Sequence, residues 1–210
     1  VFEVNYFDRK AYLAQSPQFY KQMAMAAGFE KVFMVSPVFR AELSFTTRHL
    51  TEFTGWDFEV SYINDHHDVM KELEGMIISG FEKLEEFEVP KNNFPELTMV
   101  QAKEILSKRG VSSPEQYDLS PEEERAISEY IKKEHDHDFV FITEYHKSKS
   151  AFYHMRLEEG SDYSRRADLI YKGIEVVTLA QREHRPEILE KQAKEKGMDL
   201  EPLKDYLTFF

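Results

Sequence analysis

Cysteine is absent from the 210 residues of this chain. Disulfide bonds, zinc sites with thiolate ligands and thiol catalysis are therefore excluded, and the absence is typical of a reducing compartment. Long apolar runs are missing too, since no stretch of about 18 uncharged apolar residues occurs. The first residues, VFEVNYFDRK, lack the basic start and apolar middle of a signal peptide. We expect a cytoplasmic protein that makes no contact with a membrane.

Basic residues are outnumbered, with 27 Lys and Arg against 39 Asp and Glu and a formal net charge of −12. A molecule of this sign repels polyanions, so any contact with nucleic acid has to be local. Apolar and aromatic residues are plentiful, at 41% and 14% of the chain. That content supports the core of one large globular domain, and no internal repeat or low-complexity segment is present.

Alternation and capping patterns predict an α+β fold. A period close to two over residues 31–43 and 52–63 predicts an antiparallel pair of strands joined by a long polar loop. Further strand-like runs occur at 139–143, 151–157, 167–173 and 174–180. Amphipathic helical patterns lie between these runs, and a helical insert is predicted at about residues 98–136. We expect an antiparallel sheet flanked by helices.

The segment SPQFYKQMAMAAG predicts a helix with marked ends. Ser16 is a good N-cap, Pro17 suits the first helical position, and Gly28 suits the position just past the helix. Phe19 and Met23 recur at helical spacing and are predicted to form its buried stripe.

The stretch PVFRAELSFTTRHLTEFTGWDFE carries many charges for a sequence that otherwise favours a buried sheet: Arg40, Glu42, Arg48, His49, Asp57 and Glu59. In the second strand, Asp57 and Glu59 share one face with Gly55, and Trp56 and Phe58 share the other. This alternation predicts a polar face that binds a ligand and an apolar face that joins the core. Glycine within a strand indicates that something approaches the backbone closely.

The elements FRAE and RHLTEFTGWDFE, separated by a loop, resemble the second signature motif of the class II aminoacyl-tRNA synthetases. YLAQSPQFYKQM and AQREHR are similar to the aspartyl-tRNA synthetases of archaeal and eukaryotic type, and the resemblance runs in order along nearly the whole chain. It implies the antiparallel catalytic core of that class and the activation of aspartate with ATP and Mg²⁺. It also implies transfer to tRNA(Asp) and a homodimer in the complete protein.

The resemblance implies a role for each matching residue. For ATP these are Arg40 as the catalytic residue at the α-phosphate and substrate carboxylate, Glu42 and Phe53 at adenine, and Arg48 with His49 at the outer phosphates. For aspartate they are Ser16, Gln18 and Asp57 at the α-ammonium group, and Lys21 with Arg182 at the side-chain carboxylate.

For the metal, the resemblance implies that Asp168, Glu175 and Thr178 bind magnesium, which also makes Glu175 part of the ATP site. Oxygen ligands suit this hard cation. The pair Thr178-Leu179 departs from the Ser-Gly or Ser-Ser that is usual in the family, and Leu179 adds bulk there.

The implied reaction needs no general base in its first step, because the attacking carboxylate is already ionised. Catalysis then consists of positioning and neutralisation of phosphate charge. Lys21 would favour aspartate over asparagine, because a neutral amide leaves a buried cation unpaired.

The same resemblance sets an expectation for the ends of the chain. The first signature motif and an N-terminal anticodon-binding barrel would precede Val1, and the glycine-rich third motif would follow Phe210. On this interpretation residues 1–210 are a partial catalytic domain with little activity alone.

Two alternatives stay open. One is a paralogue that adenylates aspartate for an acceptor other than tRNA, as in asparagine synthesis, and the other is a non-catalytic binding module. The histidine-rich segments NDHHD and EHDHD allow a zinc or nickel site, but helix-end histidines are the preferred interpretation.

Overall fold

The structure is a computed structural model that describes residues 1–41 and 50–210. The chain divides into two compact units, one formed by Val1–Tyr62 with Glu201–Phe210 and the other by Ile63–Leu200. Among the described residues, no helix is long and apolar enough to cross a membrane.

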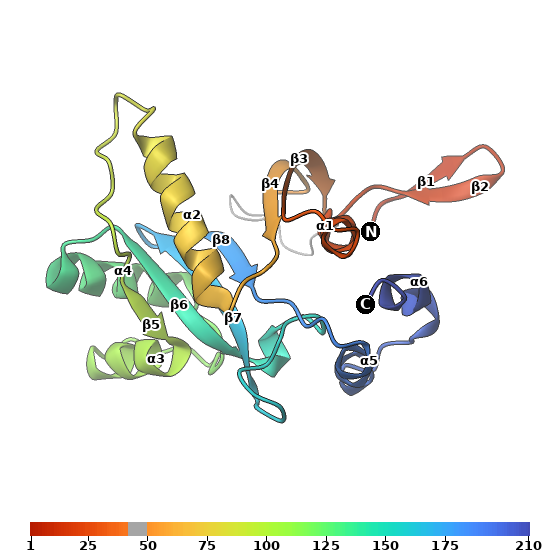
Figure 1. Ribbon diagram of the computed structural model, residues 1–210. Helices are drawn as coiled ribbons and strands as arrows, with labels where there is room; N and C mark the ends of the chain where they lie inside the picture. The colour runs from red at the N-terminus through yellow and green to blue at the C-terminus, as the bar shows by residue number, and fades with distance from the viewer. Residues whose placement is uncertain (42–49) are drawn as a thin grey trace. The chain divides into compact units, whose positions relative to one another are not determined.

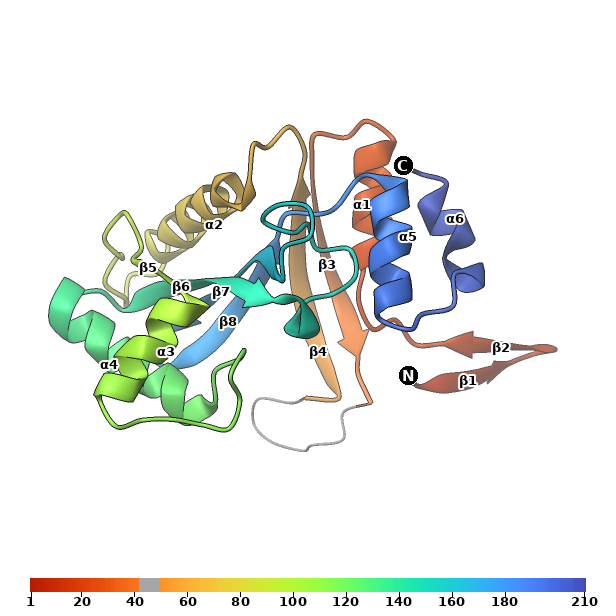
Figure 2. The ribbon, with the colours of Figure 1, turned by 90° about the horizontal axis from the view of Figure 1, so that it is seen from below.

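The first unit contains two antiparallel strand pairs and short helices (Figures 1 and 2). Its elements are β1 (Glu3–Tyr6), β2 (Arg9–Tyr12), α1 (Gln18–Ala26), β3 (Lys31–Phe39), β4 (Glu52–Val60), a 3₁₀ turn (Glu201–Leu203) and α6 (Lys204–Leu207). β3 and β4 lie side by side in the predicted antiparallel arrangement, with Ser36 opposite Gly55. β3 ends at Phe39, before the predicted limit at residue 43, and β4 begins at Glu52 as predicted but ends at Val60 instead of residue 63.

The assignment of core and polar faces in β4 was wrong. Gly55 and Glu59 are buried, whereas Trp56 on the predicted core face is 52% exposed. The reason is that α1 packs on this strand pair and supplies a cation, Lys21, to the acidic face. The group that approaches Gly55 closely is a protein side chain, since a Cβ atom at this position would lie 3.0 Å from Val38 Cγ2.

Helix α1 also differs from the prediction in detail. Pro17 is the N-cap, and the Ser16 hydroxyl accepts a hydrogen bond from the Gln18 amide at 3.1 Å. Phe19 is 41% exposed, and the buried side chains of the helix are Lys21 and Gln22 instead of the apolar stripe. Past the C-terminal end, Gly28 takes the predicted left-handed conformation with φ of 98°.

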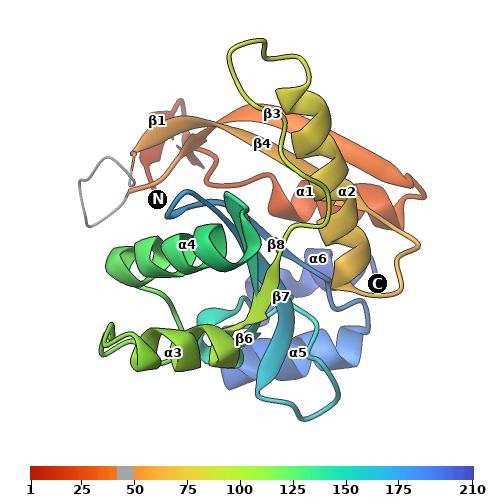
Figure 3. The same cartoon turned by 90° about the vertical axis from the view of Figure 1, so that its left-hand side faces the viewer.

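The second unit contains a four-stranded sheet with helices on both faces (Figures 1 and 3). Its elements are α2 (His66–Phe81), β5 (Glu96–Thr98), α3 (Met99–Lys108), α4 (Pro121–His135), β6 (Phe139–His146), a 3₁₀ turn (Lys147–Lys149), β7 (Tyr163–Tyr171), β8 (Ile174–Ala180) and α5 (Pro186–Glu195). The strand order is β5-β6-β7-β8, with β5 parallel to β6 and the other neighbours antiparallel. The α+β prediction is confirmed, with one parallel pair that the sequence pattern did not indicate.

Local sequence accounts for the helix starts. Asp65 accepts a hydrogen bond from the His67 amide as the N-cap of α2. Ser120 and Glu123 form a complete capping box at α4, with Pro121 at its first turn. Both helices of the predicted insert, α3 and α4, lie within residues 99–135.

The sheet has a different helix layer on each face. α3 and α4 pack on one face, where a buried cluster joins them to β6 and β7: Met99, Ala102, Leu106, Ala126, Ile127, Ile131, Val140, Ile142, Tyr145 and Ile170. α2 packs along β7 and β8 (Figure 3). The alternation of β6 separates Val140 and Ile142, which join this cluster, from Phe139 and Phe141, whose rings contact Phe94.

One predicted strand is not a strand. Residues 151–157 form only isolated bridges, His154 with Arg182 and Arg156 with Ser164. The backbone amides of this segment form single hydrogen bonds with neighbouring segments. For example, the Met155 amide donates to the Gln181 carbonyl at 2.9 Å, and no continuous ladder of strand hydrogen bonds forms.

Candidate functional site

A buried lysine between two carboxylates is the main polar feature of the first unit. Lys21 Nζ lies 3.0 Å from Asp57 Oδ1 and 3.3 Å from Glu59 Oε2, and it also donates to the Phe58 carbonyl at 3.3 Å. We call Lys21, Asp57 and Glu59 the Lys21 cluster. Lys21 is 4% exposed and Glu59 9%, whereas Asp57 keeps 29% of its surface. The cluster has one positive and two negative charges, and Asp57 is its side most open to solvent.

Two amides of α1 form a chain of hydrogen bonds on the same helix. Gln18 Nε2 donates to Gln22 Oε1 at 3.2 Å, and the Tyr206 hydroxyl donates to the same oxygen at 3.1 Å. Gln22 is 2% exposed, and its Nε2 has no hydrogen-bond partner among the described residues. A buried donor without a hydrogen-bond partner is uncommon. Sequence reasoning missed Gln22, because a glutamine within a helix carries no pattern that predicts burial.

Arg40 and Phe53 come together at the end of the strand pair. The guanidinium carbon of Arg40 lies 5.2 Å from the centre of the Phe53 ring, and its Nε donates to the Gln15 carbonyl at 3.4 Å. Cation–π contact favours this arrangement. The residues predicted for the α-phosphate and for adenine are therefore neighbours. Three other predicted ATP ligands, Glu42, Arg48 and His49, lie outside the described residues.

The second unit holds an acidic cluster on β7 and β8. Asp168 lies opposite Thr178 in the strand register, and a shift of one residue brings Glu175 opposite Ile170. Thr178 Oγ1 donates to Glu175 Oε1 at 2.8 Å. The three predicted metal ligands therefore share one face of the sheet, because alternate residues of a strand point to the same side. We call Asp168, Glu175 and Thr178 the Asp168 cluster.

The bulky side chain of Leu179 does not crowd the Asp168 cluster. It is 6% exposed and pairs with Ala167, one residue along from the Asp168–Thr178 pair. Its side chain therefore lies on the opposite face of the sheet.

Burial and mutual repulsion disfavour charge on both carboxyl groups. Burial raises the pKa of Asp168, and the charge of Arg166 opposes that rise. Desolvation and the charge of Asp168 raise the pKa of Glu175 to about 7, although solvent still reaches its side chain. Tyr145, buried beside Asp168, has its pKa raised well above its usual value by burial and by that carboxylate. A cation would relieve this repulsion.

The donor atoms of the Asp168 cluster fit magnesium. Two carboxylates and one hydroxyl supply only oxygen ligands, which magnesium prefers. The carboxylate of Glu175 lies on the side of the cluster that solvent reaches.

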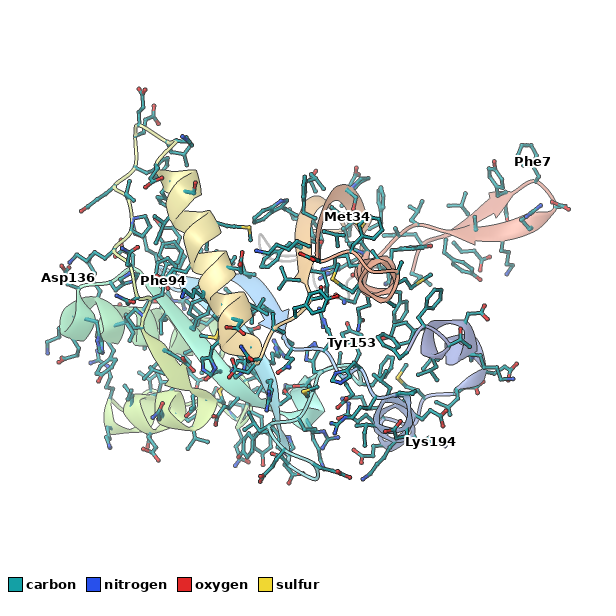
Figure 4. The ribbon with its side chains drawn as sticks, in the orientation of Figure 1. Phe7, Met34, Phe94, Asp136, Tyr153 and Lys194 are labelled. Carbon is teal, nitrogen blue, oxygen red and sulfur yellow. The ribbon has the colours of Figure 1, made fainter. Side chains whose placement is uncertain are left out.

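Arg182 lies on the segment that follows β8. Its guanidinium carbon lies 4.9 Å from the centre of the ring of Tyr153, which is labelled in Figure 4. The next residue, Glu183, is fully buried and forms paired hydrogen bonds with Arg185 at 2.9 and 2.8 Å.

The histidine-rich segments are accounted for by helix ends. Ligand atoms of Asp65, His66 and His67 lie within 4.8 Å of one another. The Asp65 carboxylate is already engaged as the N-cap of α2, and Asp65 Oδ1 lies 3.2 Å from His67 Nδ1. At the other segment, Asp136 ends α4 (Figure 4), and both ring nitrogens of His137 are bonded to the backbone, to Phe139 at 3.0 Å and to the Lys91 carbonyl at 3.0 Å.

The family model described as "tRNA synthetases class II (D, K and N)" matches residues 1–210. The chain belongs to this class II synthetase family. A curated aspartate--tRNA(Asp/Asn) ligase of Aeropyrum pernix is 42% identical over 224 residues, covering 100% of this chain and 51% of the relative. An aspartate--tRNA(Asp) ligase of Pyrococcus furiosus is 39% identical, with the same coverage.

Comparison with solved structures also finds aspartyl-tRNA synthetases. The aspartyl tRNA synthetase of Entamoeba histolytica superimposes with a TM-score of 0.88 and 36% identity, covering 94% of this chain and 44% of that one. The chain spans about half the length of the curated relatives it matches.

Within this class II synthetase chain, the structure groups the predicted residues by unit. The first unit holds Ser16, Gln18, Lys21, Arg40, Phe53 and Asp57, and the second holds Asp168, Glu175, Thr178 and Arg182. Sequence reasoning missed Arg166 and Tyr145, which contact Asp168. Arg166 stands just before the strand-like run predicted at residues 167–173, whereas the observed β7 begins at Tyr163, so the sequence did not place Arg166 and Asp168 on one face of a strand.

Proposed function

We propose that the protein carrying this chain is an aspartate--tRNA ligase, which activates aspartate with ATP and transfers it to tRNA(Asp). The observation that carries the proposal is the buried Lys21 held between Asp57 and Glu59. Aspartate offers an ammonium group that suits Asp57 and a side-chain carboxylate that suits Lys21. Asparagine and lysine, the other substrates of this family group, lack that negative charge.

Discrimination follows from the loss of one charge-assisted hydrogen bond, since Lys21 keeps Asp57 and Glu59 as partners with any substrate. A substrate without a side-chain carboxylate gives up a charge-assisted hydrogen bond to Lys21, a type of bond worth about 1.5–3 kcal/mol. The excess of negative charge in the Lys21 cluster supports ammonium binding as well. We propose that Ser16 and Gln18 bind the same ammonium group, and that Arg182 binds the side-chain carboxylate.

The proposed reaction has two steps. A carboxylate oxygen of aspartate attacks the α-phosphorus of ATP, the bond to the bridging oxygen breaks, and pyrophosphate leaves with that electron pair. A ribose hydroxyl of tRNA then attacks the acyl carbon, the bond from that carbon to the phosphate oxygen breaks, and AMP leaves while the hydroxyl proton is released. Arg40 supports the first step, because an always-charged guanidinium stabilises negative charge that develops on the α-phosphate.

The proposed ATP and metal residues complete the chemistry. Phe53 provides an aromatic face for adenine, with Glu42, Arg48 and His49 proposed for the rest of the nucleotide. Asp168, Glu175 and Thr178 would hold Mg²⁺, which supplies neutralisation of phosphate charge when bound. We further propose a homodimer in the cytoplasm.

The deciding experiment measures ATP–pyrophosphate exchange with the intact protein in the presence of aspartate, asparagine or lysine. We expect exchange with aspartate at a kcat/KM at least tenfold above that with the other two. Equal exchange with asparagine would overturn the choice of substrate, and no exchange would indicate a non-catalytic module. Charging of tRNA(Asp) then tests the acceptor, since a paralogue with another acceptor would exchange pyrophosphate without charging tRNA.

A further inference from the structure

Arg166 is the closest cation to the Asp168 cluster in the described part of the second unit. Its Nη2 donates to Asp168 Oδ2 at 2.6 Å, and its Nε donates to Asp168 Oδ1 at 3.2 Å. Both carboxylate oxygens are therefore engaged by one guanidinium. Arg166 is 14% exposed and Asp168 1%, so water weakens this pair little.

Two further contacts hold the guanidinium in position. Arg166 Nη1 donates to the Lys149 carbonyl at 2.6 Å. The guanidinium carbon lies 4.1 Å from the centre of the Tyr145 ring, within the range of a cation–π contact. Neither contact involves Asp168, so both stay available if Asp168 takes another partner.

The position of Arg166 matters because a metal would need the same oxygen atoms. A buried carboxylate requires a compensating charge, and a guanidinium that never deprotonates supplies it permanently. A divalent cation bound to Asp168 would lie beside this positive charge and would be repelled by it. The two cations therefore compete for one carboxylate.

We propose that Arg166 is a built-in counter-ion of Asp168 that a divalent metal must displace, so that Arg166 sets the metal affinity of the free protein. The inference rests on the metal site of the proposed function. It assigns Arg166 as a positioning residue, which holds both carboxylate oxygens of Asp168 in place in the metal-free protein. If Asp168 were to bind a metal, Arg166 would give up its two hydrogen bonds to Asp168 and would keep the hydrogen bond to the Lys149 carbonyl and the cation–π contact with Tyr145.

The test measures metal binding directly in the intact protein without ATP. Mn²⁺ is titrated at pH 8 and followed by electron paramagnetic resonance, for the wild type and for Arg166→Met. We expect the variant to bind Mn²⁺ at least tenfold more tightly, because the competing charge is gone. Lys172→Met is the matched control, since it removes one positive charge from an exposed site of the same unit and should leave the affinity unchanged.

Thermal unfolding gives a second readout. Without metal, Arg166→Met should melt at a lower temperature than the wild type, because Asp168 is left buried without its partner. Addition of Mg²⁺ should raise the melting temperature of the variant more than that of the wild type. If Arg166→Met does not fold, Arg166→Lys keeps the charge but loses the paired bonds, and it should show a smaller gain in Mn²⁺ affinity.

Equal Mn²⁺ affinity in the wild type and in a folded Arg166 variant would overturn the inference. That result would leave the proposed function intact, because aspartate-dependent pyrophosphate exchange by the wild type is measured separately. Conversely, a protein without exchange activity could still show the predicted gain in metal affinity.

Discussion

Replacement of Lys21 by methionine is the most informative perturbation of the first unit. Methionine keeps most of the volume of the side chain and removes its charge, so packing changes little. On the proposed assignment, the variant deprives bound aspartate of a charge-assisted hydrogen bond worth about 1.5–3 kcal/mol. At about 1.36 kcal/mol per tenfold change in rate, kcat/KM for aspartate should fall by about 10-fold to 150-fold. The preference for aspartate over asparagine should fall by a similar factor, and the KM for ATP should change little.

The same change removes the partner of two carboxylates. Breaking a buried ion pair by deleting one member costs about 3–5 kcal/mol, and the partial exposure of Asp57 lowers the expected loss to about 2–3 kcal/mol. Lys10→Met is the matched control, because Lys10 and Glu3 form an exposed pair at 2.9 Å whose loss should cost below about 1 kcal/mol.

A double variant separates folding from substrate binding. Lys21→Met with Glu59→Gln removes the buried charge that the single variant leaves behind, so the urea midpoint should recover towards the wild type. Use of aspartate should not recover, because Lys21, the cation proposed to bind the aspartate side chain, is still missing. Pyrophosphate exchange and urea unfolding are measured on the same preparations. An unchanged KM for aspartate in Lys21→Met would refute the assignment of Lys21.

Three further predictions test the rest of the chain. Glu175→Gln should abolish pyrophosphate exchange with the fold intact, as judged by circular dichroism, whereas Glu158→Gln at an exposed position should not change the rate. Burial and the neighbouring His67 lower the pKa of His66 from 6.5 to about 4, so the unfolded state binds more protons and stability is lost as pH falls from about 6.5 to 4. His66→Leu should remove up to about 3 kcal/mol of this pH dependence in urea unfolding. Gly55→Val should destabilise by about 1–3 kcal/mol through overpacking, whereas Gly75→Ala, where no atom lies within 4 Å, should stabilise by about 0.5–1 kcal/mol.

Each of these has a contrary outcome. Near wild-type exchange by Glu175→Gln with unchanged magnesium dependence would make Glu175 a structural residue. Identical pH profiles of stability for the wild type and His66→Leu would contradict the shifted pKa of His66. A Gly55→Val variant as stable as the wild type would show that Val38 can move aside.

The local sequence was sufficient to predict elements that are specified by neighbouring residues, such as capped helices and alternating strands. Ser120 and Glu123 predicted the start of α4, and alternation predicted the antiparallel pairing of β3 with β4. The motif around Arg40 was sufficient to identify the family, because it combines residue types and spacings that seldom occur together by chance.

Burial and partner choice were decided by the tertiary structure. The sequence predicted Asp57 and Glu59 on an open polar face, but the packing of α1 makes that face the buried one and gives it Lys21 as a counter-ion. The contact of Arg166 with Asp168 is equally invisible in the sequence, where two charges on one strand look like solvated surface. Periodicity reports only which residues share a face. Which face is covered, and which charge neutralises which, depends on segments distant in the chain, and only their packing determines it.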